Sequence, residues 1–364
     1  MEQRSNQEEK ELLAVIQKLL NLILFLLFVV IVLLYFLIFG IPRPGSEATI
    51  GNSLAGSSQT AMLQTEKKSA PAVWTAPDTT QLPTGELRKQ ILYGKSLIAN
   101  TALYLGPLGS VAHISNGMNC QNCHLDAGTR PYGNNYSAVA STYPKFRERS
   151  GKTEDIFKRV NDCLERSLNG KTLDSSSNEM KAIKAYITWL GIKVKKGTKP
   201  PGSGIQDLPF MDRAADPGKG ELVFTSKCIS CHAADGMGKL NADNKTYQYP
   251  PLWGEHSYNT GAGLYRLSRL AGYVKNNMPF GATQASPQLS DAEAWDVAAF
   301  VNSQYRPKGN ISKDWPKLAA KPIDHPFGPY ADSFTETQHK YGPFGQMAAL
   351  KNMEKEKQKV KQVN

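Results

Sequence analysis

The chain has 364 residues, of which 40% are hydrophobic and 21% are charged, and its formal net charge at pH 7 is +11. This composition is typical of a globular protein with enough apolar residues for two small cores, and it excludes a largely disordered chain. The basic excess favours anionic partners or substrates. Because the basic residues are dispersed and accompany no nucleic-acid-binding motif, we predict no nucleic-acid partner.

A long apolar segment lies near the N-terminus. Residues 19–41 read LLNLILFLLFVVIVLLYFLIFGI, and Asn21 is the only strongly polar residue among them. This segment is long enough to cross a bilayer, so we predict a single transmembrane anchor behind a cytoplasmic tail over residues 1–18. A cleaved signal peptide is the alternative, although the block is long for a signal and ends in Ile-Pro-Arg-Pro rather than in small residues.

Basic residues predict the orientation of this anchor. Arg4, Lys10 and Lys18 precede the apolar block, whereas only Arg43 follows it closely. Despite the acidic residues among them, these charges place the N-terminus in the cytoplasm and the rest of the chain in the periplasm, beside a bacterial inner membrane. Residues 42–83 are rich in Gly, Ser, Thr, Ala and Pro, and they predict a flexible linker.

Two short motifs indicate the chemistry of the remaining chain. Residues 120–124 read Cys-Gln-Asn-Cys-His, and residues 228–232 read Cys-Ile-Ser-Cys-His. In a c-type haem motif both thiols bond to the porphyrin vinyl groups, and the histidine binds the iron. The cysteine pairs lie too far apart for a zinc ribbon, and a thioredoxin-like dithiol explains neither the repetition nor the histidines. We therefore predict two covalently bound haem c groups, held by Cys120, Cys123 and His124 and by Cys228, Cys231 and His232.

The first motif lies in residues 84–205, which have the pattern of a small helical cytochrome c. Thr84 can cap a helix before the motif, and a capping box at residues 176–179 can open a helix after it. Apolar residues recur at helical spacing in both segments, at Leu87, Ile91, Leu97 and Ile98 and at Met180, Ile183, Ile187 and Leu190. We expect these two helices and the haem attachment turn to pack around the porphyrin.

A further helix is predicted between them, where Thr153 can cap the segment and Gly170 can end it. One side of this helix is apolar and carries Ile156, Val160, Leu164 and Leu168. A second face, about a hundred degrees round the helix, carries Arg159, Cys163, Arg166 and Ser167.

Cys163 is the fifth cysteine, and it has no disulfide partner because the other four are assigned to haem. A lone cysteine is ordinarily a buried structural thiol, and that interpretation remains open. The arginines on its face favour another one, since cationic neighbours favour the thiolate, which can bind iron or attack sulfur. A pocket lined by arginine also suits a small dianion.

A segment rich in Lys, Gly and Pro at residues 191–204 marks the boundary to a second haem domain, residues 206–308. Asp216 and Pro217 predict a helix start before the second motif, and a capping box at residues 290–293 opens another helix, so the second domain repeats the plan of the first. Met278 has the context of the loop methionine that binds iron in a class I cytochrome c; the alternative is a core methionine.

The remaining polar features carry less information. His113 and His256 are interpreted as ordinary polar or core histidines.

The C-terminal extension, residues 309–364, is rich in proline, which few helices can accommodate. Its last residues form a Lys-rich tail that we expect to be solvated. The predicted fold class is thus mainly α, with two cytochrome c-like haem domains in tandem behind an N-terminal transmembrane helix and flexible linker.

Several runs of residues together resemble one protein family. Residues 119–124, 127–131, 143–151 and 159–167 are similar to the dihaem thiosulfate dehydrogenases, which are also linked to tetrathionate reductase activity, and the resemblance extends from about residue 87 to residue 343. Enzymes of this family are periplasmic and couple two thiosulfates into tetrathionate; some also run the reverse reduction. The family has a similar C-terminal extension, which implies that the extension wraps the body.

The resemblance also implies roles for individual residues. Cys163 would be the distal ligand of the first, catalytic haem, opposite His124, while Arg149, Arg159 and Ser167 would line the anion site. For these last three, a solvated or structural polar role is the alternative. The family further implies that Lys275 can take the place of Met278 on the second iron in one redox state.

The function that the resemblance implies is a membrane-anchored periplasmic dihaem cytochrome c that oxidises thiosulfate to tetrathionate. Electrons would pass to a soluble or membrane partner such as a cytochrome c. A membrane-tethered dihaem electron carrier without substrate chemistry is the alternative, and a dihaem peroxidase is a third interpretation. A simple carrier gives no reason for an unpaired cysteine among arginines.

Overall fold

The computed structural model describes residues 16–32 and 72–363. Residues 16–32 form a helix, which belongs to a different compact unit from residues 72–363. No helix among these described residues combines the length and apolar character that a membrane span requires. Residues 33–41 of the predicted anchor lie outside the described residues, as do residues 1–15 of the predicted tail and residues 42–71 of the predicted linker.

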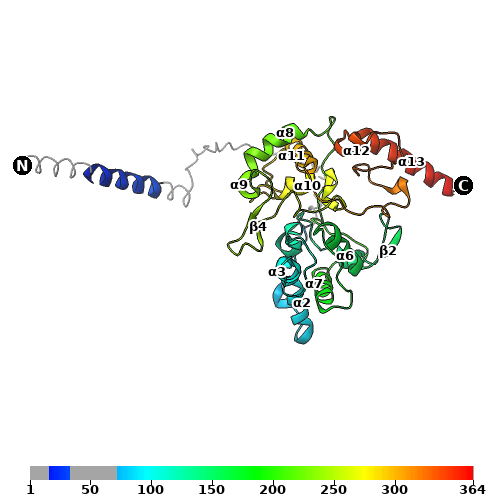
Figure 1. The fold of residues 1–364 in the computed structure, drawn as a ribbon, viewed down its shortest axis with the longest axis horizontal. Coiled ribbons are helices and arrows are strands. Elements are labelled where there is room, and N and C mark those ends of the chain that lie inside the picture. The colour runs from blue at the N-terminus through cyan, green and yellow to red at the C-terminus, as the bar shows by residue number, and fades with distance from the viewer. Residues whose placement is uncertain (1–15, 33–71, 364) are drawn as a thin grey trace, which may run out of the picture. The chain divides into compact units, whose positions relative to one another are not determined.

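Helices dominate the second unit, in agreement with the mainly α prediction (Figure 1). Its α-helices are α2 (Gly85–Ala99), α3 (Thr101–Leu105), α4 (Leu125–Gly128), α5 (Val139–Thr142), α6 (Ile156–Arg166), α7 (Asn178–Leu190), α8 (Pro217–Lys227), α9 (Ile229–His232), α10 (Leu267–Asn277), α11 (Asp291–Ser303), α12 (Glu336–Tyr341) and α13 (Gly345–Val363). Its 3-10 helices are η1 (Thr79–Gln81), η2 (Cys120–Asn122), η3 (Gly263–Tyr265) and η4 (Leu318–Ala320). Two antiparallel hairpins pair β1 (Lys145–Arg147) with β2 (Lys152–Glu154) and β3 (Lys239–Leu240) with β4 (Tyr247–Tyr249).

Each haem domain is built on one pair of crossing helices, α2 with α7 in the first domain and α8 with α11 in the second (Figure 1). Both crossings occur at a glycine. A Cβ atom on Gly94 would lie 2.0 Å from the carbonyl oxygen of Ala182, and one on Gly220 would lie 1.9 Å from that of Asp296. Because no side chain fits at either point, the backbones can approach only where the residue is glycine. The two domains therefore repeat one plan, as the sequence predicts.

Helix starts in the second domain agree with the prediction. Asp216 accepts hydrogen bonds from the N–H groups of Gly218 and Lys219, with a proline at the first helical position of α8. Ser290 and Glu293 form the predicted capping box of α11. In the first domain Ser177 rather than Ser176 caps α7, a shift of one residue within the predicted segment.

Helix α6, which carries Cys163, is shorter than predicted. Asp155 caps it, whereas Thr153 lies in strand β2 and pairs with strand β1. The carboxylate takes the capping position because the hairpin holds the preceding residues in an extended conformation. The helix ends at Arg166, before Gly170. The predicted apolar stripe is buried at Ile156, Leu164 and Leu168.

The end of the predicted linker packs on the first haem domain instead of remaining a tether. The N–H of Trp74 donates to the carbonyl oxygen of Pro201 at 2.9 Å. Leu82 is 7% exposed and belongs to the same core as Ile91. Burying a large apolar side chain contributes about 1.5–3 kcal/mol, which explains why these residues are ordered in a stretch of otherwise small and polar residues. The first domain therefore begins before Thr84.

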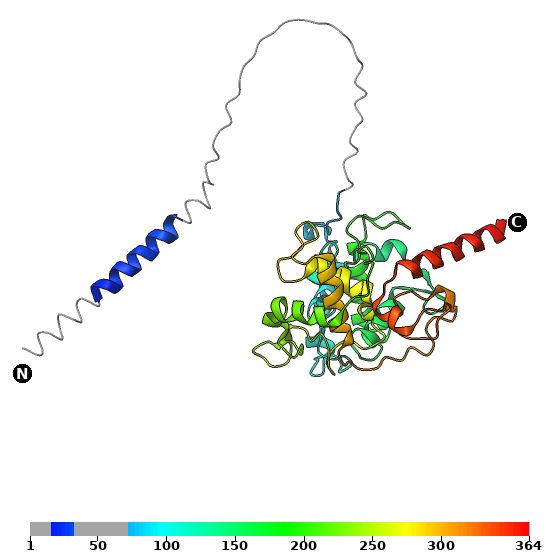
Figure 2. The same cartoon turned by 90° about the horizontal axis from the view of Figure 1, so that it is seen from above.

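The C-terminal extension, orange to red in Figure 2, contacts both haem domains, as the family resemblance implies. Asp314 forms an ion pair with Arg149 of the first domain, while Phe344 and Met347 are buried in the core of the second. Up to residue 344 the extension holds only the short helices η4 and α12, in agreement with its prolines. The Lys-rich end forms most of helix α13, and residues 352–357 are exposed, so this tail is helical as well as solvated.

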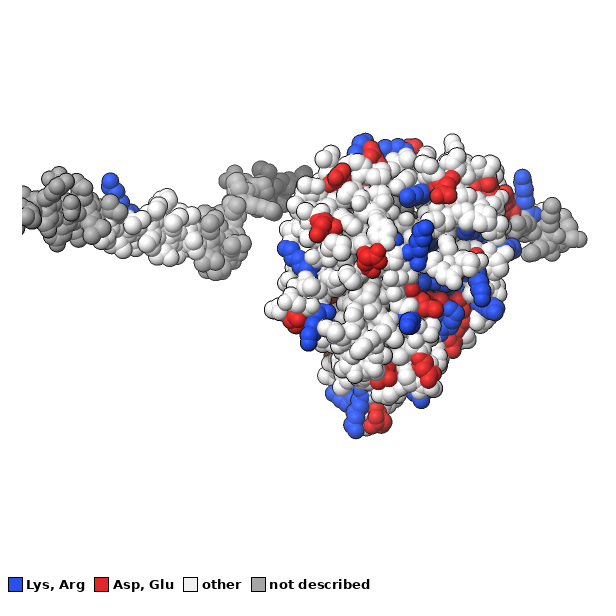
Figure 3. Space-filling view, in the orientation of Figure 1, with Lys and Arg blue, Asp and Glu red and all other residues white. Residues whose placement is uncertain are grey.

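The surface charges are interspersed on the face shown in Figure 3, where lysine and arginine alternate with aspartate and glutamate. This distribution agrees with the dispersed basic residues of the sequence. No large basic patch of the kind that binds nucleic acid is present on that face.

The helix crossing in the first domain can be tested by the substitution Gly94→Ala. The added methyl group would overlap a backbone carbonyl that cannot rotate away, so we expect the free energy of unfolding of the holoprotein to fall by about 1–3 kcal/mol. Denaturant unfolding followed by circular dichroism measures it. Gly345→Ala is the control, because a Cβ there meets nothing within 4 Å, and a change of at most about 0.5 kcal/mol is expected. Equal effects of both substitutions would show that the crossing is not the constraint.

Candidate functional site

The first Cys-x-x-Cys-His motif forms a tight turn that begins in η2. The N–H of Asn119 donates to the Asn122 side chain at 2.7 Å, and the N–H of Cys120 donates to the Thr101 hydroxyl at 2.9 Å. Burial raises the pKa of the Cys120 thiol to about 11 and that of the Cys123 thiol to about 12. Both cysteines are therefore neutral thiols in the free chain at pH 7, held on one turn.

The imidazole of His124 is oriented by a backbone carbonyl. Its Nδ1 lies 2.5 Å from the carbonyl oxygen of Asn134. Because a carbonyl only accepts, Nδ1 carries the proton and Nε2 is left with a free lone pair for a metal. The ring of Tyr136 stacks on the imidazole, with 4.5 Å between centroids. Burial lowers the pKa of His124 to about 4, so the ring is neutral at pH 7, which is the form that binds iron.

The second motif repeats this arrangement in helix α9. Nδ1 of His232 lies 3.0 Å from the carbonyl oxygen of Pro250, so Nε2 is again the free nitrogen. Burial lowers the pKa of His232 and raises the pKa of the Cys228 thiol to about 11. In both motifs the thiols and a bare imidazole nitrogen are thus prepared for a c-type haem.

Met278 and Lys275, the two candidates for the distal ligand of the second iron, have different surroundings. Met278 is half-buried at the C-terminal end of α10. The ammonium group of Lys275 forms an ion pair with Asp291 at 2.7 Å. Because the ammonium group of Lys275 is held by this ion pair, Met278 is the candidate for the distal ligand of the second iron in this conformation. His113 and His256 are both exposed, in agreement with their interpretation as ordinary polar residues.

Cys163 is half-buried and lies in the neighbourhood of the first motif. Besides burial, the charge that Cys163 can carry raises the pKa of Cys120 and Cys123. It is also the main cause of a raised pKa at Arg159, above the ordinary value for a guanidinium. Charges act this strongly only at short range, so Cys163 lies close to Arg159 and to the first haem motif.

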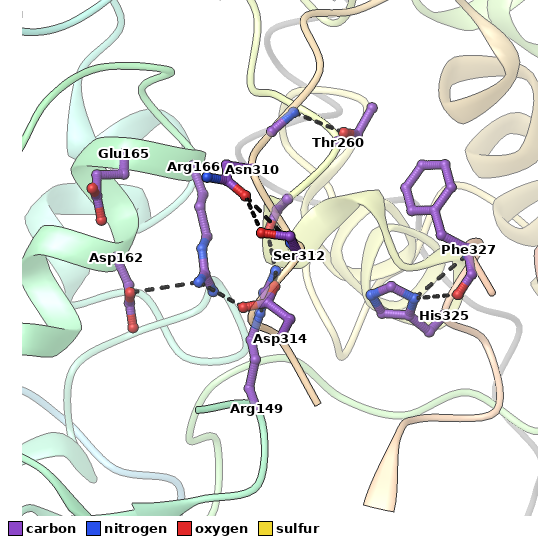
Figure 4. A network of polar contacts seen from close by, with 12 residues as sticks. Arg149, Asp162, Glu165, Arg166, Thr260, Asn310, Ser312, Asp314, His325 and Phe327 are labelled. Carbon is purple, nitrogen blue, oxygen red and sulfur yellow. Dashed lines mark hydrogen bonds and ion pairs between the residues drawn. The ribbon is translucent and has the colours of Figure 1, made fainter. Parts of the chain in front are cut away.

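Arg149 and Arg166 meet at a carboxylate of the C-terminal extension (Figure 4). Asp314 accepts from Nε of Arg149 at 2.8 Å and from Nη2 of Arg166 at 3.0 Å. Arg149 also donates to the carbonyl oxygen of Gly261 at 2.8 Å, and Arg166 lies 3.8 Å from Asp162. Most of the hydrogen-bonding capacity of Arg149 is therefore used within the protein. Burial and the neighbouring Arg166 lower its pKa.

Ser167, the third residue predicted for the anion site, follows Cys163 by one helical turn. It is half-buried, and its N–H donates to the carbonyl oxygen of Cys163 at 2.8 Å. It therefore lies at the C-terminal end of α6, one turn from Cys163. A groove of about 560 Å³ on the outer side of the first domain, between α2 and α7, contains none of the predicted site residues.

Three kinds of contributor to these sites could not be found from the sequence. Tyr136 stacks on His124, but nothing in the sequence distinguishes it from the other tyrosines. The carbonyl oxygens that orient the two histidines belong to loops, and any residue can supply a carbonyl. Asp314 lies 165 residues from Arg149, in a Pro-rich segment without periodicity, so no local pattern could reveal the contact.

Comparison with known families agrees with the geometry of both motifs. Residues 110–193 match the family described as SoxA/TsdA, cytochrome c domain, and residues 218–304 match the family described as Cytochrome c. Each match contains one Cys-x-x-Cys-His motif. The fold and the two sites thus define a dihaem c-type cytochrome with two covalently bound haems.

Two similar proteins identify the family within this class of cytochromes. The thiosulfate dehydrogenase of Allochromatium vinosum is 37% identical over 237 residues, which are 64% of this chain and 84% of that protein. That of Psychrobacter arcticus is 35% identical over 275 residues, 74% of this chain and 80% of that protein. The chain belongs to the thiosulfate dehydrogenase family, and the resemblance found in the sequence is confirmed.

A solved structure supports the same assignment. The thiosulfate dehydrogenase TsdBA from Marichromatium purpuratum, in its "as isolated" form, is 28% identical, with a TM-score of 0.61. The match covers 72% of this chain but only 54% of that one, so this chain spans about half the length of that solved protein.

The Arg149–Asp314–Arg166 network can be tested by Asp314→Ala. Asp314 is 7% exposed, and its loss leaves two largely buried guanidinium groups without their shared counterion, so we expect the free energy of unfolding to fall by about 3–5 kcal/mol. Asp207→Ala is the matched control, because Asp207 pairs with Arg269 at 2.8 Å but is 74% exposed; a loss below about 1 kcal/mol is expected. Indistinguishable denaturation midpoints for the two variants would contradict the proposed role of the network.

Proposed function

We propose that this chain is a thiosulfate dehydrogenase that oxidises two thiosulfates to tetrathionate at the first haem. The observation that carries the proposal is the position of Cys163 close to Arg159 and to the first haem motif. A reduced sulfur next to a guanidinium group is suited to react with a sulfur-containing dianion. When bound, each haem supplies an acceptor for one electron at a time.

Arg159 is the main anion-binding residue in this proposal. Bringing two thiosulfate dianions together is opposed by their repulsion, which a nearby guanidinium offsets. Arg159 has the Cys163 sulfur as its strongest charged neighbour, whereas Arg149 already shares Asp314 with another arginine. Arg149 therefore has less capacity left for an anion and contributes chiefly to the structure around the site. Ser167 offers a hydroxyl one helical turn from Cys163.

The reaction can be written as bonds to the Cys163 sulfur. The sulfane sulfur of one thiosulfate bonds to Sγ of Cys163, and two electrons leave as this sulfur–sulfur bond forms. A second thiosulfate then attacks the same sulfane sulfur, forms the central bond of tetrathionate and releases Cys163 as a thiolate. Two thiosulfate dianions thus give one tetrathionate dianion and two electrons. The same steps in reverse reduce tetrathionate, and we propose that the site is reversible.

His124 and Cys163 would hold the iron of the first haem, and His232 and Met278 would hold that of the second. A thioether ligand raises the haem potential, which suits a group that accepts electrons from the first haem. The half-buried position of Met278 and the engaged ammonium group of Lys275 support this assignment. From the second haem electrons would pass to a soluble or membrane partner such as a cytochrome c.

The location proposed for the enzyme is the periplasmic face of a bacterial inner membrane. The apolar sequence of residues 19–41 and the basic residues before it support an anchor with its N-terminus in the cytoplasm. Fractionation of cells that express the full chain distinguishes this anchor from a cleaved signal.

The substitution Cys163→Ala tests the catalytic proposal. Because the other four cysteines hold the haems, the variant should keep both of them, while kcat for thiosulfate with ferricyanide falls by about a thousandfold or more. The low-spin thiolate signal in the electron paramagnetic resonance spectrum of the oxidised protein should disappear together with the activity. Tetrathionate with a reduced viologen measures the reverse reaction on the same protein.

Glu165→Ala is the matched control, since Glu165 is an exposed residue of the same helix, and it should leave both the rate and the spectrum unchanged. A Cys163→Ala protein with both haems and native turnover would falsify the catalytic assignment and leave the chain as an electron carrier.

Met278→His tests the ligand of the second haem. Replacement of the thioether by an imidazole should lower the midpoint potential of that haem, as a redox titration measures. Lys275→Gln serves as the control and should leave the potential unchanged, because its ammonium group is held by Asp291 and by the carbonyl oxygen of Leu289. The opposite pattern, an effect of Lys275→Gln alone, would assign the lysine instead.

A further inference from the structure

Arg306 is a buried arginine whose hydrogen-bonding capacity the protein does not satisfy. It lies just beyond helix α11, and only 3% of its surface is exposed. Its Nη2 donates to the carbonyl oxygen of Val301 at 2.6 Å. Its Nε and Nη1 are buried and have no hydrogen-bond partner among the described residues. Buried guanidinium groups ordinarily have acceptors on most of their N–H groups, so an acceptor outside the polypeptide is indicated.

The surroundings of Arg306 offer aromatic faces but no carboxylate. Its guanidinium lies over the rings of Tyr258, at 4.2 Å from the centroid, and Tyr265, at 5.0 Å. The Tyr258 hydroxyl is used in a bond to Asn302 at 3.0 Å. Two stacked rings fix the plane of the guanidinium and partly stabilise its charge. They do not replace a counterion, and among the described residues Arg306 forms no ion pair with an acidic side chain.

Arg306 also lies at the seam between the two haem domains. Tyr258 belongs to the second domain by sequence, yet it is buried in the same core as Leu164 and Met180 of the first domain. Cys120 of the first haem motif packs against that core. Arg306 therefore stacks on a ring of the core against which Cys120 of the first haem motif packs. It also follows the last helix of the second haem domain, α11.

We propose that Arg306 binds a propionate group of one of the two haems at this seam. Haem propionates are the carboxylates of the cofactor, and a carboxylate is the acceptor that guanidinium groups bind best. The propionate would satisfy donors that the protein leaves unpaired and would neutralise the buried charge. The inference rests on the two haems and not on sulfur chemistry at Cys163, so the two proposals can fail separately.

Arg306 would then be a positioning residue that also sets a potential. A cation near a haem disfavours the ferric state, which carries more positive charge than the ferrous state, and therefore raises the midpoint potential. Because Arg306 lies at the seam, a propionate that it binds would be held between the two domains. The potential that Arg306 sets would then bear on electron transfer from one domain to the other.

The experiment is a redox titration of the full-length holoprotein carrying Arg306→Met. We expect the potential of one haem to fall, with a change of about tenfold in its oxidised-to-reduced ratio, or ~59 mV for a one-electron couple. The haem whose spectrum shifts identifies the source of the propionate. Arg306→Lys retains the charge but not the planar fork of hydrogen-bond donors. The midpoint potential of this variant should therefore lie between those of Arg306→Met and the native protein.

Redox-difference infrared spectroscopy on protein with ¹³C-labelled haem propionates gives a second readout. The labelled carboxylate band should shift in Arg306→Met and, to a smaller extent, in Arg306→Lys. This measurement also applies if the methionine variant does not fold, because the lysine variant and the native protein can then be compared directly.

Lys308→Gln is the matched control, since it removes the same charge from an exposed position two residues away, and it should change neither the potentials nor the infrared band. If Arg306→Met or Arg306→Lys retains both haems and leaves the labelled carboxylate bands where they are in the native protein, Arg306 does not bind a propionate and the proposal is overturned.

Discussion

The contact of two helix backbones at a glycine is the constraint on which both haem domains depend. Gly94 lets α2 meet α7, and Gly220 lets α8 meet α11, at distances where any side chain would overlap a backbone carbonyl. Each Cys-x-x-Cys-His motif follows the first helix of its pair. The crossing therefore determines where the motif can lie, and burial against the resulting core keeps each histidine neutral with one nitrogen free for iron.

Arg149, Arg159 and Arg306 lie in three different electrostatic environments, and each environment suits a different role. Arg149 is neutralised by a carboxylate, so its contribution is mainly structural. Arg159 has a sulfur atom as its strongest charged neighbour, and Arg306 is buried with two donors unpaired. A buried cation needs an anion, and where the polypeptide supplies none, a substrate or a cofactor can do so. The unsatisfied charges thus mark the two places where non-protein anions are proposed to bind.

How much of this could be predicted from the sequence depends on how local each interaction is. The haem motifs and the caps at Asp216 and Ser290 are complete within a few residues, and they were predicted correctly. The cap at Thr153 was wrong because a hairpin partner seven residues earlier holds it extended. The Asp314 contact could not be predicted, since it joins segments 165 residues apart through one ion pair. The positions of the axial ligands and of the anion-binding residues remain predictions.

The extension links stability to the charge of the proposed anion pocket. The single carboxylate of Asp314 partly offsets the charges of Arg149 and Arg166, and the same contact fastens the extension to the first domain. Without that carboxylate, two further cations would be free to bind thiosulfate and also tetrathionate, which carry the same charge. Binding substrate and product more tightly by the same amount does not accelerate the reaction and slows release. A site in which Arg159 is left to act while Asp314 offsets part of the charge of its neighbours would therefore suit the proposed reaction in both directions.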